Sequence, residues 1–347
     1  MKAARLHNYN EDLKIDEVDE PKADEPLDVI VKIGAAGLCR TDLHIKDGDW
    51  KEVQDGAGVK LPYTLGHENA GWIESIGSSV SNVEVGDAVI VHPKTTCGLC
   101  RACRAGDDMH CPTGLFPGLV VDGGFANFLK TSARNVIKLD AGLEPKDVAA
   151  QADAGLTAYH AVKKAAPLLY PGTTAVVIGA GGLGHIGIQC LKALTPAKVV
   201  VVDTNEAALK LAEQLGADDS VVADGSEVDK VKEMTDGLGA EVVLDFVAER
   251  GVEKAAPSMV RDHGSYYVIG YGGNLETKTH EMIFREISIV GNLVGTYNDL
   301  AELMSLNAEG KVKLHTSTYP LDAINDAMAD LEGGRLQGRG ILIPEGV

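Results

Sequence analysis

A glycine-rich turn between an apolar strand and a helix most constrains how this chain of 347 residues can fold. Residues 179–184 read Gly-Ala-Gly-Gly-Leu-Gly; they follow the apolar run Ala175–Ile178 and precede a helical segment, His185–Leu194. Glycines at this spacing allow a tight turn and let the backbone approach a pyrophosphate at the helix N-terminus. The flanking strand and helix predict a dinucleotide site. The alternative is a glycine-rich turn of an unrelated α/β fold.

The next strand carries the residue that selects the cofactor. Asp203 ends the run Val199–Val202, about twenty residues after the glycine turn, where a carboxylate can accept hydrogen bonds from the ribose hydroxyls. The same carboxylate repels a 2′-phosphate, and neither Thr204 nor Asn205 offers a balancing cation. The sequence therefore predicts NAD rather than NADP.

The hydrophobic pattern divides the chain into two domains. Up to about residue 147, short β-rich runs predict an antiparallel or barrel-like β domain: Val29–Ile33, Ala70–Ile76 and Ala88–Val91. An Ala-rich helical stretch, 148–166, marks the boundary. Beyond it, apolar strands alternate with helices, as in a doubly wound parallel sheet: Val199–Val202, Ala207–Leu215, Val242–Phe246 and Tyr266–Ile269. Near the end of the chain, the hydrophobic pattern predicts helices over 299–309 and 321–331 and a last strand over 340–343.

Charge and hydropathy disfavour several classes of partner. The chain has 51 acidic and 32 basic residues and a formal charge of −19, which repels nucleic acids and anionic membrane surfaces. An acid excess of this size also fits a surface adapted to high salt, and that alternative stays open. The N-terminus has no signal-peptide core, and no apolar run reaches the ~18 residues of a membrane span. We expect a cytoplasmic protein.

Four of the six cysteines are grouped in one short lobe, about 95–112. Their spacing supplies four soft ligands, enough to close a tetrahedral structural zinc site: Cys97, Cys100, Cys103 and Cys111. The neighbouring His110 could compete as a zinc ligand, but four thiolates already fill the four coordination positions of the ion. Disulfides and an iron–sulfur cluster are the weaker alternatives.

A second, dispersed set contains Cys39 and His67. A catalytic zinc takes about three protein ligands from separate segments and keeps an exchangeable position. Each residue alone is more often an ordinary core or loop residue. Their arrangement upstream of the cysteine lobe and the glycine turn is more informative than either residue.

Over essentially its whole length, the chain resembles the zinc-containing alcohol dehydrogenases of the medium-chain dehydrogenase/reductase superfamily. The motifs that carry the resemblance are Gly66-His67-Glu68, Cys39-Arg40-Thr41-Asp42 with His44, the cysteine lobe and residues 179–184. The resemblance implies an α/β protein with a doubly wound Rossmann cofactor domain, 153–296. It also implies a mainly β, GroES-like catalytic domain that is discontinuous, 1–152 and 297–347.

The resemblance makes Cys39 and His67 ligands of a catalytic zinc. The third ligand of better-known members is a cysteine, but the matching segment here offers Asp153, whose carboxylate is chemically acceptable. Glu68 is the rival third ligand, and in the family it lies behind the metal. Asp42 would hydrogen-bond a ligand such as His67 from the second shell; its alternative role is a helix cap or turn.

The mechanism implied by the resemblance is hydride transfer from a zinc-activated alcohol to NAD. Thr41 would take the displaced proton, the nicotinamide ribose hydroxyl would pass it on, and His44 would deliver it to solvent, although His44 could be an ordinary exposed helix residue. Arg40 and Arg339 match positions that contact the pyrophosphate, and Thr157 matches one near the nicotinamide. The remaining cofactor contacts would come from Gly179, Gly181, Gly182, Leu183, Gly184, Asp203, Val247, Ile269 and Leu293.

These observations predict an alcohol dehydrogenase with NAD and two zinc ions per chain, acting on small primary or secondary alcohols. We expect a homo-oligomer, a tetramer rather than a dimer, as in microbial relatives. The alternatives are a polyol or sugar dehydrogenase, whose third ligand is commonly glutamate, and a non-catalytic, zinc-stabilised NAD-sensing protein. The substrate stays open; the residues expected near its pocket are Trp50, His92, Pro93, Phe116 and Leu293.

Overall fold

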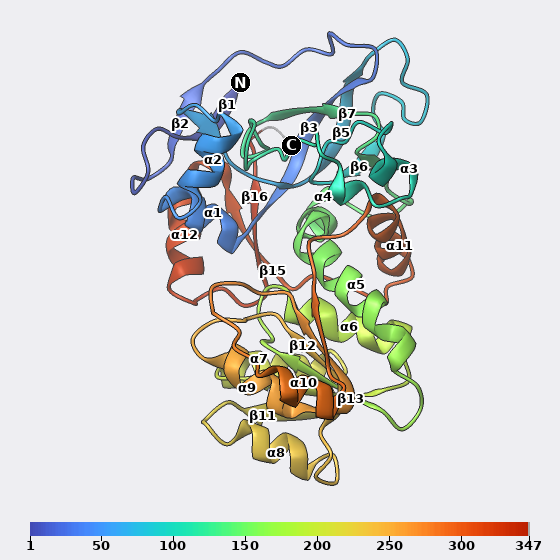
Figure 1. The fold of residues 1–347 in the computed structure, drawn as a ribbon. Coiled ribbons are helices and arrows are strands. Elements are labelled where there is room, and N and C mark those ends of the chain that lie inside the picture. Colours follow the sequence, from blue (N-terminus) through green and yellow to red (C-terminus); the bar gives the residue numbers. More distant parts are fainter. Residues whose placement is uncertain (346–347) are drawn as a thin grey trace. The chain divides into compact units, whose positions relative to one another are not determined.

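The computed structural model describes residues 1–345, which divide into two compact units (Figure 1). Unit 1 comprises Met1–Ala154 and the described part of Thr296–Val347, and unit 2 comprises Gly155–Gly295. The predicted boundaries, 152/153 and 296/297, differ by one or two residues from those of the structure, 154/155 and 295/296. The first unit is therefore built from both ends of the chain, as the expected discontinuous domain would be.

Unit 1 is mainly β. Its larger sheet has seven strands: β15 (Thr316–Pro320), β16 (Arg339–Ile343), β3 (Asp28–Leu38), β5 (Glu68–Ile76), β6 (Ala88–Val91) and β8 (Val136–Lys138) in spatial order, with β7 (Phe128–Ser132) paired to β3. Only β15 and β16 run parallel. A smaller antiparallel sheet has the order β2 (Lys14–Glu17), β1 (Lys2–Leu6) and β4 (Tyr63–Thr64). The predicted runs in β3, β5, β6 and β16 are confirmed as strands.

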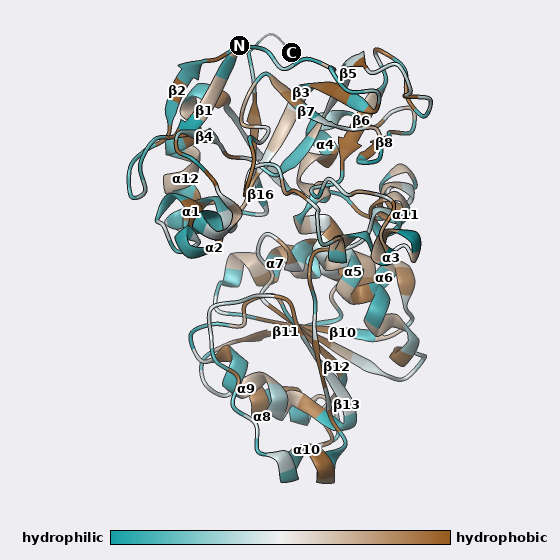
Figure 2. Ribbon diagram, turned by 45° about the horizontal axis from the view of Figure 1, so that its top comes forward, coloured by the Kyte–Doolittle hydropathy of each residue, from teal (hydrophilic) through white to brown (hydrophobic). Residues whose placement is uncertain are grey.

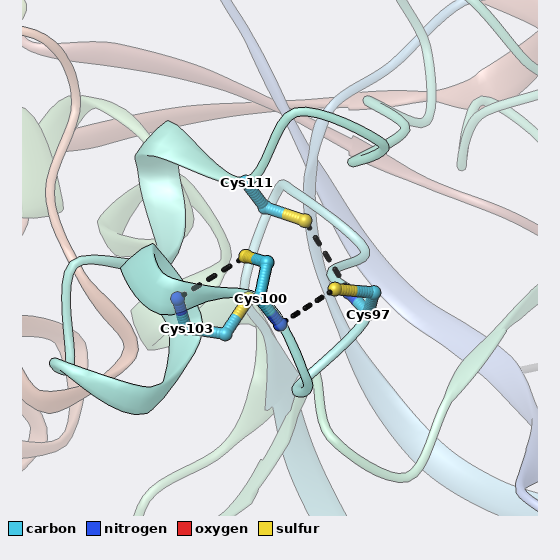
Figure 3. Close-up of side chains that lie close together, drawn as sticks. All are labelled: Cys97, Cys100, Cys103 and Cys111. Carbon is cyan, nitrogen blue, oxygen red and sulfur yellow. Dashed lines mark hydrogen bonds between the residues drawn. The ribbon is translucent and has the colours of Figure 1, made fainter.

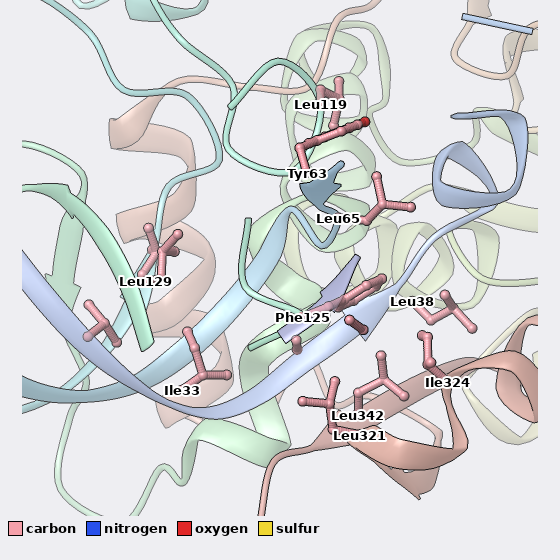
Figure 4. Close-up of a cluster of buried hydrophobic side chains, with 14 of the residues drawn as sticks. Ile33, Leu38, Tyr63, Leu65, Leu119, Phe125, Leu129, Leu321, Ile324 and Leu342 are labelled. Carbon is pink, nitrogen blue, oxygen red and sulfur yellow. The ribbon is translucent and has the colours of Figure 1, made fainter. Parts of the chain in front are cut away.

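Strand β3 organises the core of unit 1. It pairs with β16, β5 and β7, and nine of its eleven residues are buried. Figure 4 shows Ile33 and Leu38 of this strand beside Phe125, Leu342 and Ile324. Burying each such side chain contributes about 1.5–3 kcal/mol, so this cluster fixes the strand ends from which the site residues project.

The helices of unit 1 are short and lie around these sheets: α1 (Arg40–Lys46), α2 (Lys51–Ala57), α3 (Arg101–Arg104), α4 (Pro145–Val148), α11 (Tyr297–Ala308) and α12 (Ile324–Glu332), with 3₁₀ turns η1 (Asp108–His110), η2 (Ala149–Ala152) and η4 (Leu321–Ala323). The helical stretch predicted over 148–166 is present but is interrupted at one residue. Asp153 has φ −126° and ψ −60°, which is not helical, and separates η2 from α5 (Ala154–Ala165). This break sets the Asp153 carboxylate beside Cys39 and His67.

Unit 2 is a six-stranded sheet in which every neighbouring pair is parallel. The order is β11 (Asp219–Val222), β10 (Lys198–Asp203), β9 (Thr174–Ile178), β12 (Ala240–Asp245), β13 (Val260–Val268) and β14 (Ser288–Gly291). The central strands are apolar (Figure 2), as burial on both faces requires. The order reverses between β9 and β12, which is where open α/β sheets bind ligands. The predicted doubly wound domain is confirmed.

Helices connect these strands: α6 (Gly184–Leu194), α7 (Glu206–Gln214), α8 (Glu227–Glu233), α9 (Val252–Met259) and α10 (Thr279–Arg285), with η3 (Ala166–Leu168) following α5. Helix α6 begins directly after the glycine turn, and its first eight residues are buried. The turn therefore lies at the carboxyl end of β9 and at the amino end of a helix.

Candidate active site and metal centres

The four-cysteine lobe gathers its sulfur atoms around one point (Figure 3). The Sγ atoms of Cys97, Cys100, Cys103 and Cys111 all lie within 4.8 Å of one another. Four Zn–S bonds of about 2.3 Å place sulfur pairs about 3.8 Å apart, so this group fits a tetrahedral zinc. All six cysteines are free thiols, as a metal site rather than disulfides requires.

Backbone amides in the lobe favour the thiolate form of these cysteines. The N–H groups of Leu99 and Cys100 donate to Cys97 Sγ at 3.5 and 3.4 Å, and they lower the pKa of Cys97 to about 6. The Cys103 amide donates to Cys100 Sγ, and the Cys97 amide to Cys111 Sγ, both at 3.5 Å. Since thiolate is the form that binds metal, the lobe backbone is arranged for zinc.

A second ligand group joins three distant segments of unit 1. The ligand atoms of Cys39, His67 and Asp153 lie within 4.8 Å of one another. Asp153 Oδ2 is 3.6 Å from His67 Nε2 and 4.0 Å from Cys39 Sγ. A thiolate, an imidazole and a carboxylate are all zinc ligands, and three of them leave one position of a tetrahedral ion open. The residues present therefore fit a catalytic zinc.

Asp42 touches two of these ligand segments. Its Oδ2 accepts the Cys39 amide at 2.9 Å as part of the capping box of α1. Its Oδ1 lies 3.3 Å from His67 Nδ1, and neither of these two buried atoms has a hydrogen-bond partner within residues 1–345. The capping role of Asp42 is therefore present, and its other oxygen faces His67, where the predicted hydrogen bond to the ligand stays a prediction.

The backbone before His67 requires glycine. Gly66 has φ +97°, and a Cβ there would lie 2.4 Å from the ring of the buried Phe125. The chain therefore passes close to the core at this point before it enters β5. This close approach aims His67 at the ligand group.

Glu68 is fully buried and both of its carboxylate oxygens are engaged. Oε1 accepts the Ala154 amide at 2.9 Å, and Oε2 accepts a hydrogen bond from Arg339 Nη2. Burial raises the pKa of Glu68 and the neighbouring Arg339 opposes that rise. The geometry thus brings Asp153, rather than Glu68, to Cys39 and His67.

The expected relay residues lie at the start of α1. Thr41 Oγ1 is 3.7 Å from Cys39 Sγ. One turn later, His44 is partly exposed and its Nδ1 lies 2.9 Å from Asp49 Oδ2. Phe116 lies at the same site, with its ring centroid 6.2 Å from that of His67 in an edge-on arrangement.

The expected substrate-pocket and arginine positions of unit 1 differ in exposure. Trp50 is half-buried against the core, whereas His92 and Pro93 are buried. Arg40 is exposed at the first position of α1. Arg339, by contrast, is buried against Glu68.

The expected cofactor residues of unit 2 gather at the carboxyl ends of its strands. A Cβ on Gly184 would lie 1.7 Å from Gly179 O, so this close approach requires glycine, whereas one on Gly181 would meet nothing within 4 Å. That open face leaves room for a phosphate. Asp203 Oδ2 accepts the Ala180 amide at 2.7 Å, which fixes the carboxylate beside the turn.

Three further expected contacts follow neighbouring strands of the same sheet. Val247 follows β12 and would touch a Cβ on Gly179 at 2.6 Å; Ile269 follows β13, and Leu293 follows β14 and is exposed. Thr157 is buried in α5. The switch point of the sheet therefore fits a dinucleotide.

Two polar contacts were missed by sequence reasoning. The pairing of Glu68 with Arg339 joins residues 271 positions apart, and no local pattern reports such a contact. The contact of His44 with Asp49 spans five residues across the end of α1. An acidic residue shortly after a histidine near a helix end is a sequence pattern from which this contact could have been predicted.

Two family models match the chain. The "Alcohol dehydrogenase GroES-like domain" matches residues 25–141, and the "Zinc-binding dehydrogenase" matches residues 182–309. An NAD-dependent alcohol dehydrogenase of Sulfurisphaera tokodaii is 35% identical, over 99% of this chain and 100% of the relative. A D-arabinose 1-dehydrogenase (NADP⁺) of Saccharolobus solfataricus is 34% identical, over 99% and 97%.

The fold is also that of solved structures. The crystal structure of the alcohol dehydrogenase from the archaeon Aeropyrum pernix has a TM-score of 0.95 and 49% identity, and the match covers 99% of this chain and 100% of that one. Within residues 1–345, no helix combines the length and apolarity that crossing a membrane requires.

Proposed function

This chain belongs to the zinc-containing alcohol dehydrogenase family, and we propose that it oxidises primary or secondary alcohols with NAD through the Cys39–His67–Asp153 site. The enzyme is an oxidoreductase of the medium-chain dehydrogenase/reductase superfamily. The observation that carries the proposal is the convergence of these three side chains, from three segments of unit 1, within 4.8 Å. A purely structural or NAD-sensing protein has no use for a three-ligand site with an open position.

The residues present divide the chemistry between them. Zinc held by Cys39, His67 and Asp153 supplies a Lewis acid that makes an alcohol hydroxyl more acidic, and bound NAD supplies the hydride acceptor. Asp42 orients His67 through Nδ1. Thr41 lies beside Cys39, where its hydroxyl can take the alcohol proton.

His44 then delivers the proton to solvent. Histidine suits this step because its ordinary pKa lies near 6.5, so it gains and loses a proton easily near neutral pH. Its ring is 30% exposed, which gives it access to water.

We propose NAD rather than NADP as the preferred cofactor because of Asp203. This carboxylate ends β10 and is bonded to the glycine turn through the Ala180 amide, where a 2′-phosphate would be repelled. The D-arabinose dehydrogenase relative is named as NADP-dependent. The alternative to an alcohol dehydrogenase that uses NAD is therefore a sugar dehydrogenase that uses NADP.

We also propose two zinc ions per chain, one in each cysteine-containing cluster. We further propose a homo-oligomer, as predicted a tetramer, in which one interface covers Ile283 and Phe284 of α10, which are 70% and 83% exposed. Light scattering of the wild type against Phe284→Glu checks this; a monomeric wild type contradicts it. The six free cysteines favour the reducing cytoplasm.

The test is NAD reduction, followed optically, for a panel of primary, secondary and polyhydric alcohols and aldoses, with zinc content measured in parallel. The proposal expects simple alcohols to reduce NAD and the wild type to hold two zinc ions. Asp153→Ala should lose activity and one zinc, whereas Asp107→Ala, an exposed lobe carboxylate, should keep both. Turnover of sugars or polyols alone would favour the alternative, and one zinc without turnover would favour an NAD-sensing protein.

A further inference from the structure

The turn after α1 brings a carboxylate back onto the expected relay histidine. Gly48 has φ +83°, in the left-handed region that favours glycine, and the Asp49 amide donates to His44 O at 2.9 Å. This backbone bond sets the Asp49 side chain beside the ring, with Oδ2 2.9 Å from Nδ1. Two independent contacts, one from the backbone and one from the side chain, thus join the same pair of residues.

The contact fixes the tautomer of the ring. An ionised carboxylate only accepts hydrogen bonds, so Nδ1 must carry the hydrogen and donate it. In neutral imidazole the other nitrogen is then unprotonated. His44 therefore presents Nε2 as the atom that can accept a proton.

We propose that Asp49 is a positioning residue for proton release, acting through His44. The inference rests on the proposed function, because it assigns a part to Asp49 in the same relay. Nε2 accepts one proton and the ring becomes a cation whose charge lies next to the Asp49 carboxylate. The ring, 30% exposed, then gives one proton to water, so that one proton enters and one leaves.

The neighbouring Asp47 provides a matched control. It belongs to the same turn, but its Oδ1 pairs with Lys46 Nζ at 3.0 Å. The Asp47 and Asp49 side chains are 41% and 62% exposed, so replacing either should leave the fold intact. Of these two carboxylates, Asp49 contacts the histidine ring, whereas Asp47 pairs with Lys46.

The first measurement is nitrogen NMR of the histidine side chains in the resting, metal-loaded enzyme, with the His44 signals assigned from His44→Ala. We expect a protonated Nδ1 and a bare Nε2 in the wild type and in Asp47→Ala. Asp49→Ala should lose this single tautomer. An unchanged His44 spectrum in Asp49→Ala would overturn the inference.

The second measurement is the steady-state rate of alcohol oxidation at neutral pH. We expect Asp49→Ala to lower kcat about two- to fivefold, the effect expected of a solvent-exposed charged pair, and Asp47→Ala to keep the wild-type rate. Asp49→Glu or added formate should restore part of the loss. A wild-type rate in Asp49→Ala refutes the role of Asp49, whereas a wild type that oxidises no alcohol refutes the proposed function and leaves the NMR result to stand by itself.

Discussion

Replacing Arg339 by methionine should strongly destabilise unit 1, because it leaves a buried carboxylate without its cation. Glu68 is 0% and Arg339 4% exposed, and the guanidinium donates to Glu68 Oε2. Removing one partner of a buried ion pair costs about 3–5 kcal/mol. For a cooperative unit of roughly 200 residues, each kcal/mol lowers the melting temperature by about 2–4 °C, so Arg339→Met should lower it by about 6–20 °C.

The assay is calorimetry of zinc-loaded protein, and the exposed pair Arg335–Asp330 supplies the control. Their contact is 2.7 Å, but the side chains are 60% and 33% exposed, so Arg335→Met should cost about 0–1 kcal/mol. The double variant Glu68→Gln/Arg339→Met should recover part of the loss, since it removes the unpaired charge. Either of two results would refute this reasoning: equal melting temperatures for Arg339→Met and Arg335→Met, or a melting temperature of the double variant no higher than that of Arg339→Met.

Three further predictions concern zinc, cofactor choice and acid stability. Cys103→Ser should lower the zinc content by one ion per chain and should also lower the melting temperature. Cys190 is buried and lies outside both ligand groups, so Cys190→Ser should keep both zinc ions. Equal zinc contents in the two variants would contradict the structural zinc site. Asp203→Ser should raise kcat/KM for NADP relative to NAD by about tenfold or more through loss of like-charge repulsion, and an unchanged ratio would remove Asp203 from cofactor selection. Burial raises the pKa of Asp218, but a backbone N–H and Lys192 more than offset this and lower it below its usual value. The stabilisation is therefore present above the unfolded pKa near 3.9 and lost as pH falls through the lowered folded pKa, so Asp218→Asn should reduce the free energy of unfolding at pH 7 and progressively less as the pH falls below about 3.9; an equal loss at every pH would contradict this.

The sequence was sufficient where a pattern is local. The glycine turn, the apolar strands of unit 2 and the four cysteines are each read from contiguous residues, and the structure places them as a doubly wound sheet and one sulfur cluster. Periodicity reports burial on both faces of a strand, and glycine reports close backbone approach. These parts of the fold need no knowledge of distant contacts.

The parts that were missed depend on contacts between distant residues. No local pattern predicts the break at Asp153, because the alanines on both sides favour a helix. The irregular backbone is explained only by the position of the Asp153 carboxylate beside Cys39 and His67. In the same way, Glu68 is a buried charge whose cation, Arg339, lies at the other end of the chain. The family resemblance grouped Cys39, His67 and Asp153 as ligands, but no local pattern reports the backbone break at Asp153 or the Glu68–Arg339 pair.

Two buried carboxylates tie the three ligand segments to one another. Asp42 accepts the Cys39 amide and faces His67 Nδ1, so it joins the first ligand segment to the second. Glu68 is adjacent to His67 and accepts the Ala154 amide, next to Asp153, so it joins the second to the third. Since both contacts are made by the chain itself, the ligand atoms are held close together before any metal binds, and less conformational entropy is lost on binding.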